Sequence, residues 1–256
     1  MKIKAEHFSP DPIALSGQCF RWRKLGEGKY EIPAFDRSVV IGLEGDCLSL
    51  SCSEEEYRSV WRSYFDLDTD YARMDERALS LGDGFLREAL LEEPGVRILR
   101  QDFWETLISF LISQNNNIPR IKKSIERLCG GEVHFPGPEE ILDMDLSEMG
   151  LGYRDTYLKS AASWFLSVNK DVPRVISGNE DISRIRGVGP KVLSCVRLYG
   201  MHRMDECPID TWMKKLIHEI YEDRLPEWIN DPSAGYFQQL CFMKIRKDSR
   251  TRHGSA

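Results

Sequence analysis

One stretch of the chain, residues 185–210, constrains the fold more than any other, because it places a glycine-rich turn between two helical segments. The turn is formed by Gly187, Val188 and Gly189, and glycine accepts a positive φ without a Cβ clash. Backbone N–H groups that point outward from such a turn, at the start of a helix, form a site for an anion such as a phosphodiester. The sequence therefore predicts two helices joined by a phosphate-binding hairpin.

Two titratable residues accompany this hairpin. Pro190 suits the first position of the second helix, and Lys191 follows it directly. Asp210 lies 19 residues further on, immediately before an amphipathic run. An aspartate at that position is a good helix cap, and it can reach the lysine if the chain doubles back. A solvated lysine that merely touches phosphate, and an aspartate that only caps a helix, are the competing interpretations.

The distribution of charge bears on the class of partner. The chain has 256 residues and a net charge of −6. Residues 1–95 carry 12 basic and 19 acidic residues (−7), whereas residues 96–256 carry 23 and 22 (+1). The C-terminal part can therefore present a basic face to nucleic acid, with candidates Lys122, Lys123, Lys191, Lys214 and Lys215.

Composition also limits the compartment and the cofactors. The seven cysteines form no CxxC pair, which argues against a zinc site, an iron–sulfur loop or a disulfide framework. No metal and no other cofactor is expected. No run reaches the roughly 18 apolar residues of a membrane span, and the N-terminus lacks a signal-peptide core. We expect a cytoplasmic protein, nucleoid-associated if the source is prokaryotic, with no membrane partner.

Hydrophobic periodicity divides the chain into two kinds of structure. Short aromatic and β-branched runs separated by turn signals predict antiparallel strands over 20–23, 30–32, 37–43 and 47–52. Helical spacing predicts helices over 103–111, 118–128, 153–168, 182–185, 192–199, 209–221 and 236–245, with a frayed tail from Lys247. The predicted fold class is α+β, with an N-terminal antiparallel β-sheet domain (1–95) followed by an all-helical region (96–256).

Four other segments carry side chains suited to handling a base. The run 114–120 displays amides from a turn, and an amide can fill the gap left by a flipped base. Residues 150–154 form a glycine turn with an aromatic wedge and an arginine at its tip. Gly17 permits close approach to a ligand. Gln238 and Phe242 share one helix face and suit a base pocket. Taken singly, each segment is equally well an ordinary loop, strand start or core helix.

Together, and in this order, these segments resemble the 8-oxoguanine DNA glycosylase family of the helix-hairpin-helix glycosylase superfamily. The resemblance covers nearly the whole chain, and it rests on SGQCFRW, ILRQDFWETLISFLISQNNNIPR, GLGYR, GVGPKVLSC with PID, and AGYFQQLCF. It implies that Lys191 is the nucleophile and Asp210 its acidic partner.

The resemblance also implies roles in recognition. The oxidised-guanine pocket would be lined by Gly17, Cys195, Gln238 and Phe242, with the Gly17 carbonyl accepting the N7 proton that guanine lacks. On the opposite strand, Asn115 would fill the vacated position, Tyr153 would wedge beside it, and Arg120 and Arg154 would read the orphaned cytosine. The chain departs from the pattern at Trp212, where relatives often have a histidine that binds phosphate.

The expected function is therefore that of a bifunctional, monomeric DNA glycosylase and AP lyase. It would excise 8-oxoguanine opposite cytosine from double-stranded DNA through a lysine Schiff base and β-elimination, in base excision repair. One alternative is a helix-hairpin-helix glycosylase for alkylated bases, but such enzymes usually lack the lysine. The other is a non-catalytic DNA-binding module.

Overall fold

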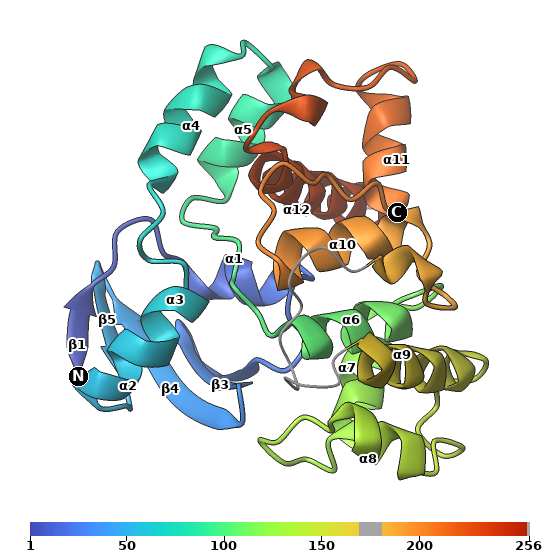
Figure 1. The fold of residues 1–256 in the computed structure, drawn as a ribbon. Coiled ribbons are helices and arrows are strands. Elements are labelled where there is room, and N and C mark those ends of the chain that lie inside the picture. Colours follow the sequence, from blue (N-terminus) through green and yellow to red (C-terminus); the bar gives the residue numbers. More distant parts are fainter. Residues whose placement is uncertain (169–180, 255–256) are drawn as a thin grey trace.

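The computed structural model of the chain describes residues 1–168 and 181–254, and its N-terminal part is built on an antiparallel sheet (Figure 1). A meander of β2 (Arg23–Gly26), β3 (Lys29–Ala34), β4 (Arg37–Glu44) and β5 (Cys47–Leu50) is extended by β1 (Lys2–Lys4) beside β5. Alternating residues of β3–β5, including Ile32, Ile41 and Leu48, are fully buried. The predicted meander is confirmed.

Two parts of this region differ from the prediction. Residues 20–22 are not a strand, because Phe20 and Trp22 are buried in two different hydrophobic clusters and β2 begins only at Arg23. The strand β1 and the helix α1 (Pro10–Leu15) were not predicted from the sequence. Both are short, and a few residues of periodicity do not distinguish them from a loop.

The remaining elements are helical. A helix with a π-helical middle, composed of α2 (Glu54–Glu56), η1 (Tyr57–Trp61) and α3 (Arg62–Tyr64), packs on the sheet through Trp61, Tyr64 and Phe65. The other helices are α4 (Tyr71–Ser80), α5 (Gly84–Glu92), α6 (Phe103–Ile112), α7 (Ile118–Leu128), α8 (Pro138–Asp143), α9 (Arg154–Val168), η2 (Ile182–Arg184), α10 (Pro190–Gly200), α11 (Thr211–Glu219), η3 (Glu227–Asn230) and α12 (Ala234–Gly254). The prediction of a predominantly helical second half is confirmed.

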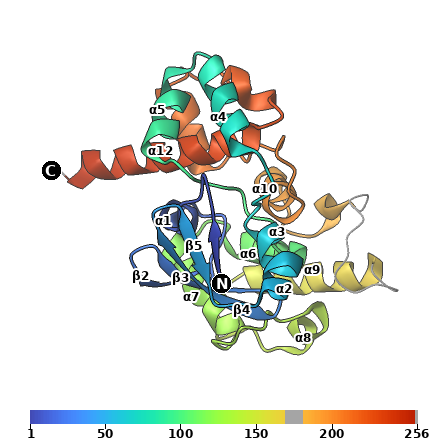
Figure 2. The same cartoon turned by 90° about the vertical axis from the view of Figure 1, so that its left-hand side faces the viewer.

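The helices α4 and α5 pack with the helical region, although they precede residue 95. Ala78, Leu86 and Ala89 are fully buried in the same hydrophobic cluster as α6, α10 and α12, and α5 contacts α12 directly. Figure 2 shows α4 and α5 above α12, on the side away from the sheet. The domain boundary at residue 95 stays a prediction. Apart from Phe20 and Leu99, the two hydrophobic clusters separate between Phe65 and Tyr71.

The C-terminal helix is longer than predicted. We expected a frayed tail from Lys247, but α12 continues to Gly254. Lys244 and Lys247 bind carboxylates of α5, and the buried Ser249 hydroxyl accepts a hydrogen bond from Lys215 Nζ (2.9 Å). These contacts continue the helix although its sequence is polar. Residues 255–256 lie outside the described residues.

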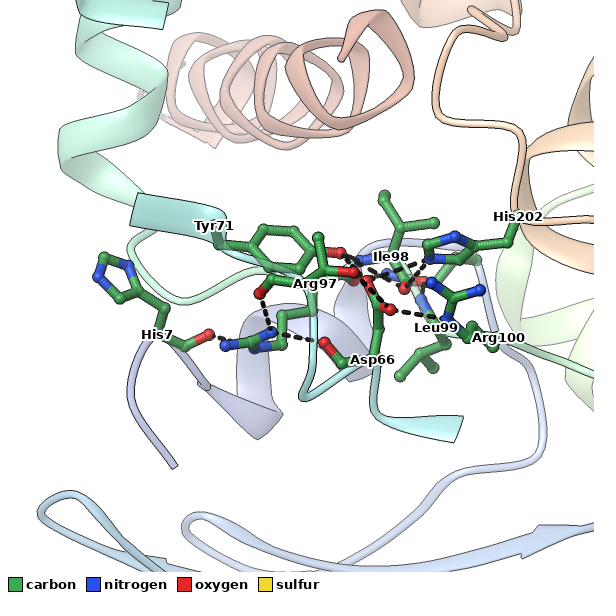
Figure 3. A network of polar contacts seen from close by, with 10 residues as sticks. His7, Asp66, Tyr71, Arg97, Ile98, Leu99, Arg100 and His202 are labelled. Carbon is green, nitrogen blue, oxygen red and sulfur yellow. Dashed lines mark hydrogen bonds and ion pairs between the residues drawn. The ribbon is translucent and has the colours of Figure 1, made fainter. Parts of the chain in front are cut away.

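A buried carboxylate joins the sheet, the helical region and the C-terminal end of α10 (Figure 3). Asp66 is 1% exposed and accepts hydrogen bonds from Thr69 Oγ1 (2.8 Å), Tyr71 Oη (2.9 Å) and Arg100 Nε (2.7 Å). His202 Nε2, just beyond α10, lies 3.1 Å from the same carboxylate. Burial by itself raises the pKa of Asp66, but hydrogen bonds and charge interactions, with His202 foremost, outweigh it and hold the pKa below its usual value.

Arg97 completes this junction from the other side. Its guanidinium is buried and donates to the carbonyl oxygens of His7 (2.7 Å), Glu6 (2.8 Å) and Asp66 (2.7 Å), and it lies 4.5 Å from the centre of the Tyr71 ring. The chain segments after β1, after α3 and before α6 are therefore fixed to one another.

Asp66→Asn is expected to lower the free energy of unfolding by about 1–3 kcal/mol near neutral pH, because buried donors lose a charged acceptor. Folding lowers the pKa of Asp66. Its stabilising contribution is therefore complete above the unfolded-state value of about 3.9 and is lost as the pH falls through the folded-state value. Urea unfolding across this acidic range checks the prediction, with the two proteins converging in acid.

Asp68→Asn is the matched control, because Asp68 is 64% exposed and pairs with Arg62 on the surface. It should change stability by less than about 0.5 kcal/mol. Equal losses for the two variants would contradict the importance of the buried junction.

Candidate active site

The glycine hairpin lies where the sequence predicted it, between η2 and α10, but its amides are arranged differently. Val188 N–H donates to Ile185 O (3.0 Å), and Gly189 N–H donates to Gly187 O (3.2 Å). These two amides are therefore used inside the turn rather than displayed outward. The first intrahelical bond of α10 comes from Leu193 N–H to Gly189 O (2.9 Å), so the amides that precede it at the helix start are the candidates to bind phosphate.

Gly187 is required by both its conformation and its surroundings. Its φ is +93°, and a Cβ atom there would lie 2.5 Å from the Tyr157 ring of α9. Tyr157 in turn contacts Tyr153 edge-on, with ring centres 5.5 Å apart. The hairpin therefore packs on Tyr157, which in turn contacts Tyr153, the residue predicted to act as the wedge.

Lys191 begins α10 and lies against the end of α6. Its Nζ donates to Ser113 Oγ (3.1 Å) and lies 5.0 Å from the centre of the Phe110 ring. It also interacts with the Cys195 thiol one helical turn later. Lys191 is only partly buried, so the amine is held in place while remaining accessible.

Asp210 caps α11, as predicted. Its Oδ1 accepts the backbone N–H groups of Trp212 (3.0 Å) and Met213 (2.9 Å). Burial raises the pKa of Asp210, while these hydrogen bonds and the charge of Lys191 act in the opposite direction. Lys191 at the start of α10 and Asp210 at the start of α11 therefore lie close enough for their charges to interact.

The four predicted pocket residues come from three separate parts of the chain. Gly17 has a φ of +78°, and a Cβ atom there would lie 3.6 Å from both Phe242 Cζ and Ile118 Cδ1. Cys195 is buried, and burial raises the pKa of its thiol to about 12, so it stays protonated. Gln238 is 3% exposed.

The Gln238 side chain has an unsatisfied acceptor. Among the buried side-chain nitrogen and oxygen atoms of residues 1–168 and 181–251, only Gln238 Oε1 has no hydrogen-bond partner. A buried polar atom without a partner is costly and rare in folded proteins. Beside Phe242 on α12, it marks a place where a ligand's donor group can bind.

The two predicted wedge residues contact each other, whereas the two arginines predicted to read cytosine differ in their exposure to solvent. Asn115 has a φ of +46°, and its Nδ2 donates to the hydroxyl of Tyr153 (3.1 Å), which is 49% exposed. Arg120 is exposed on α7. Arg154 is 6% exposed, and its guanidinium donates to the carbonyl oxygens of residues 114, 115 and 151. In this structure Arg154 therefore supports the Asn loop from behind.

Sequence reasoning missed several residues of the site. Phe110 was predicted only as part of the helix over 103–111, and Ser113 was given no role, yet both contact Lys191. Arg246 Nη1 donates to Leu15 O (2.8 Å), and its guanidinium lies 5.8 Å from the centre of the Phe242 ring. The signal for Arg246 was its position one helical turn after Phe242.

The lysines predicted to form a basic face have different surroundings. Lys215 lies 5.7 Å from the centre of the Trp212 ring and is bound to Ser249, while Lys123 and Lys214 are exposed. In the described parts of the chain, no cluster of three or more His, Cys, Asp or Glu side chains is arranged to hold a metal ion. Within the same residues, no helix combines the length and apolar character needed to cross a membrane.

Comparison with known proteins relates this site to one family. Residues 1–107 match the family described as 8-oxoguanine DNA glycosylase, N-terminal domain. The chain is 30% identical over 260 residues to the N-glycosylase/DNA lyase of Saccharomyces cerevisiae, covering 82% of this chain and 67% of the yeast protein.

Two solved structures extend the similarity over almost the full length. One is MBOgg1 in complex with a low-affinity DNA ligand, with 34% identity, a TM-score of 0.86, and coverage of 97% of this chain and 96% of the other. The other is the Clostridium acetobutylicum 8-oxoguanine glycosylase/lyase in complex with double-stranded DNA containing cytosine opposite 8-oxoG. It is 29% identical with a TM-score of 0.82, and the match covers 95% and 93% of the two chains.

Gly187→Ala is expected to lower the free energy of unfolding by about 1–3 kcal/mol, because the added Cβ overlaps the Tyr157 ring at a positive φ. Gly189→Ala is the matched control: its φ is −89°, and no atom lies within 4 Å of the added Cβ. Its stability should stay within about 0.5 kcal/mol of the parent. Chemical denaturation measures both, and an unaffected Gly187→Ala would show that the hairpin does not depend on this close approach.

Proposed function

This chain belongs to the 8-oxoguanine DNA glycosylase/lyase family, and we propose that it excises 8-oxoguanine from duplex DNA, preferably opposite cytosine, and then cleaves the strand. The observation that carries the proposal is the convergence of Lys191 and Asp210 beside a pocket that contains the unpartnered Gln238 acceptor. As a member of this family the chain is an N-glycosylase and an AP lyase. We propose that it acts as a monomer.

The proposed chemistry begins at Lys191. With the damaged nucleotide flipped out of the duplex, the neutral Lys191 amine attacks C1′ of the deoxyribose, and the C1′–N9 bond breaks with its electrons leaving on the base. Loss of the amine proton and ring opening give a Schiff base between Nζ and C1′. The imine makes the 2′ hydrogen acidic, so that its removal expels the 3′ phosphate by β-elimination.

Asp210 has two roles in this proposal. As a carboxylate it stabilises the positive charge that develops on the sugar as the base departs, and it helps to hold Lys191 in place. Its position supports these roles, because the backbone N–H bonds from α11 fix the carboxylate, and its charge interacts with Lys191. The same bonds make Asp210 a structural cap.

Recognition of the lesion is assigned to the pocket. The Gly17 carbonyl would accept the N7 proton that distinguishes 8-oxoguanine from guanine. Gln238 would bind the Watson–Crick edge, and Phe242 and the protonated Cys195 would enclose the ring. The close approach of Gly17 to Phe242 and the free acceptor of Gln238 support this arrangement.

The preference for cytosine is assigned to the residues around the Asn loop. Asn115 would fill the vacated position, with Tyr153 wedged beside it. Arg120, which is exposed at the start of α7, would donate to cytosine O2 and N3. Arg154 would join it only by exchanging some of its bonds to backbone carbonyls. With Trp212 in place of a phosphate-binding histidine, the phosphate contacts would rest on the backbone amides at the start of α10, directly after the hairpin.

Lys191→Gln should retain binding to lesion DNA but lose both excision and borohydride trapping of a covalent complex, because no amine remains to form the Schiff base. Lys29→Gln is the control, since Lys29 is an exposed lysine of β3 outside the predicted basic face, and it should trap normally. Trapping by the Lys191 variant would assign the chemistry to another amine. An absence of trapping in the parent protein would favour an alkylated-base glycosylase or a non-catalytic module.

Arg120→Ala should lower excision opposite cytosine more than opposite adenine or thymine. A lost bidentate base contact changes discrimination by about 1–3 kcal/mol, or roughly 5- to 150-fold. Excision rates for 8-oxoguanine opposite each of the four bases measure the effect. Equal losses opposite all four bases would mean that Arg120 supplies charge alone.

A further inference from the structure

In the loop that carries Gly17, the backbone carbonyls on both sides of Gly17 accept hydrogen bonds from side chains of the helical region. Leu15 O accepts from Arg246 Nη1 (2.8 Å), Ser16 O accepts from Gln239 Nε2 (3.0 Å), and Gln18 O accepts from Gln101 Nε2 (2.8 Å). Among residues 1–168 and 181–251, no hydrogen bond is made to the carbonyl between them, that of Gly17. The loop is therefore fixed on both sides of one free acceptor.

The contact to Ser16 is the most deeply buried of the three. Ser16 is 2% exposed and Gln239 is 1% exposed. Gln239 Oε1 accepts the hydroxyl of Tyr199 (2.8 Å), which is 5% exposed. The Ser16 carbonyl can only accept, so the amide NH2 of Gln239 must face it, and the Tyr199 hydroxyl then donates to the amide oxygen at the other end. Gln239 thus has one defined orientation.

The same chain of contacts leads to the nucleophile. Tyr199 lies two turns after Lys191 on α10, and its ring is stacked on Phe110, with centres 5.4 Å apart and planes 12° apart. Lys191 Nζ lies 5.0 Å from the centre of that Phe110 ring. The loop that carries Gly17 and the Lys191 side chain are therefore both held by the same buried contacts of Gln239, Tyr199 and Phe110.

We propose that Gln239, oriented by Tyr199, is a positioning residue that sets the Gly17 carbonyl for recognition of oxidised guanine. This inference rests on the proposed function. Gln239 does not touch the base; it acts through Ser16, the residue next to Gly17. Without the Gln239 donor, Ser16 O is left buried without a partner, and the loop can rotate to satisfy it. The free Gly17 acceptor then moves relative to Phe242 and Lys191.

The test compares two reactions of the same protein: excision of 8-oxoguanine opposite cytosine, and strand cleavage at a preformed AP site opposite cytosine. Gln239→Met keeps the length of the side chain and removes its amide. It should slow excision by about tenfold and leave AP-site cleavage within about twofold, because an AP site has no base to recognise. Equal slowing of both reactions, or no slowing of either, would overturn the proposal.

Tyr199→Phe provides a second variant that retains the ring stacked on Phe110 and removes only the hydroxyl. It should slow excision selectively and by a smaller factor, and the double variant should be no slower than Gln239→Met alone, because the hydroxyl acts through the amide. Additive slowing would contradict this coupling. Failure of the parent protein to excise 8-oxoguanine would instead overturn the proposed function, and this inference with it.

Discussion

The site depends on where one carboxylate is buried. Asp210 lies at the start of α11, where two backbone N–H groups bind it and the charge of Lys191 lies nearby. Burial penalises this charge, and the helix start together with the lysine offsets only part of that penalty, so the pKa of Asp210 stays above its usual value. Because the cap fixes the start of α11 and α10 fixes Lys191, the two groups meet only if both helices keep their positions against α6 and α12.

The proposed recognition of the lesion depends on more contacts than the proposed chemistry does. The proposed pocket combines the loop between α1 and β2 with side chains of α10 and α12. Those parts are held together by the Asp66 and Arg97 junction and by the amides of Gln239 and Gln101. Moreover, Gln18, next to Gly17, bonds the backbone of Arg97 and Leu99. Stability and recognition therefore share the same buried polar groups.

Much of the local structure could be predicted from the sequence because its causes are local. Asp210 caps α11 through its own side chain, and the meander follows alternation over β3–β5. The resemblance also named residues that the structure brings together, such as Gly17 and Phe242. The packing of α4 and α5 on α12, the continuation of α12 beyond Lys247, and the use of Arg154 by backbone carbonyls depend on distant partners, which periodicity does not encode.

The central claim is that Asp210 is both a cap and the charged partner of Lys191, and Asp210→Asn separates these roles. Asn caps helices about as well as Asp, so the melting temperature and the affinity for lesion DNA should stay close to those of the parent. Single-turnover excision of 8-oxoguanine opposite cytosine is the measurement that decides. The account predicts that most of the rate is lost in a folded, DNA-binding variant, and a rate near that of the parent would contradict it.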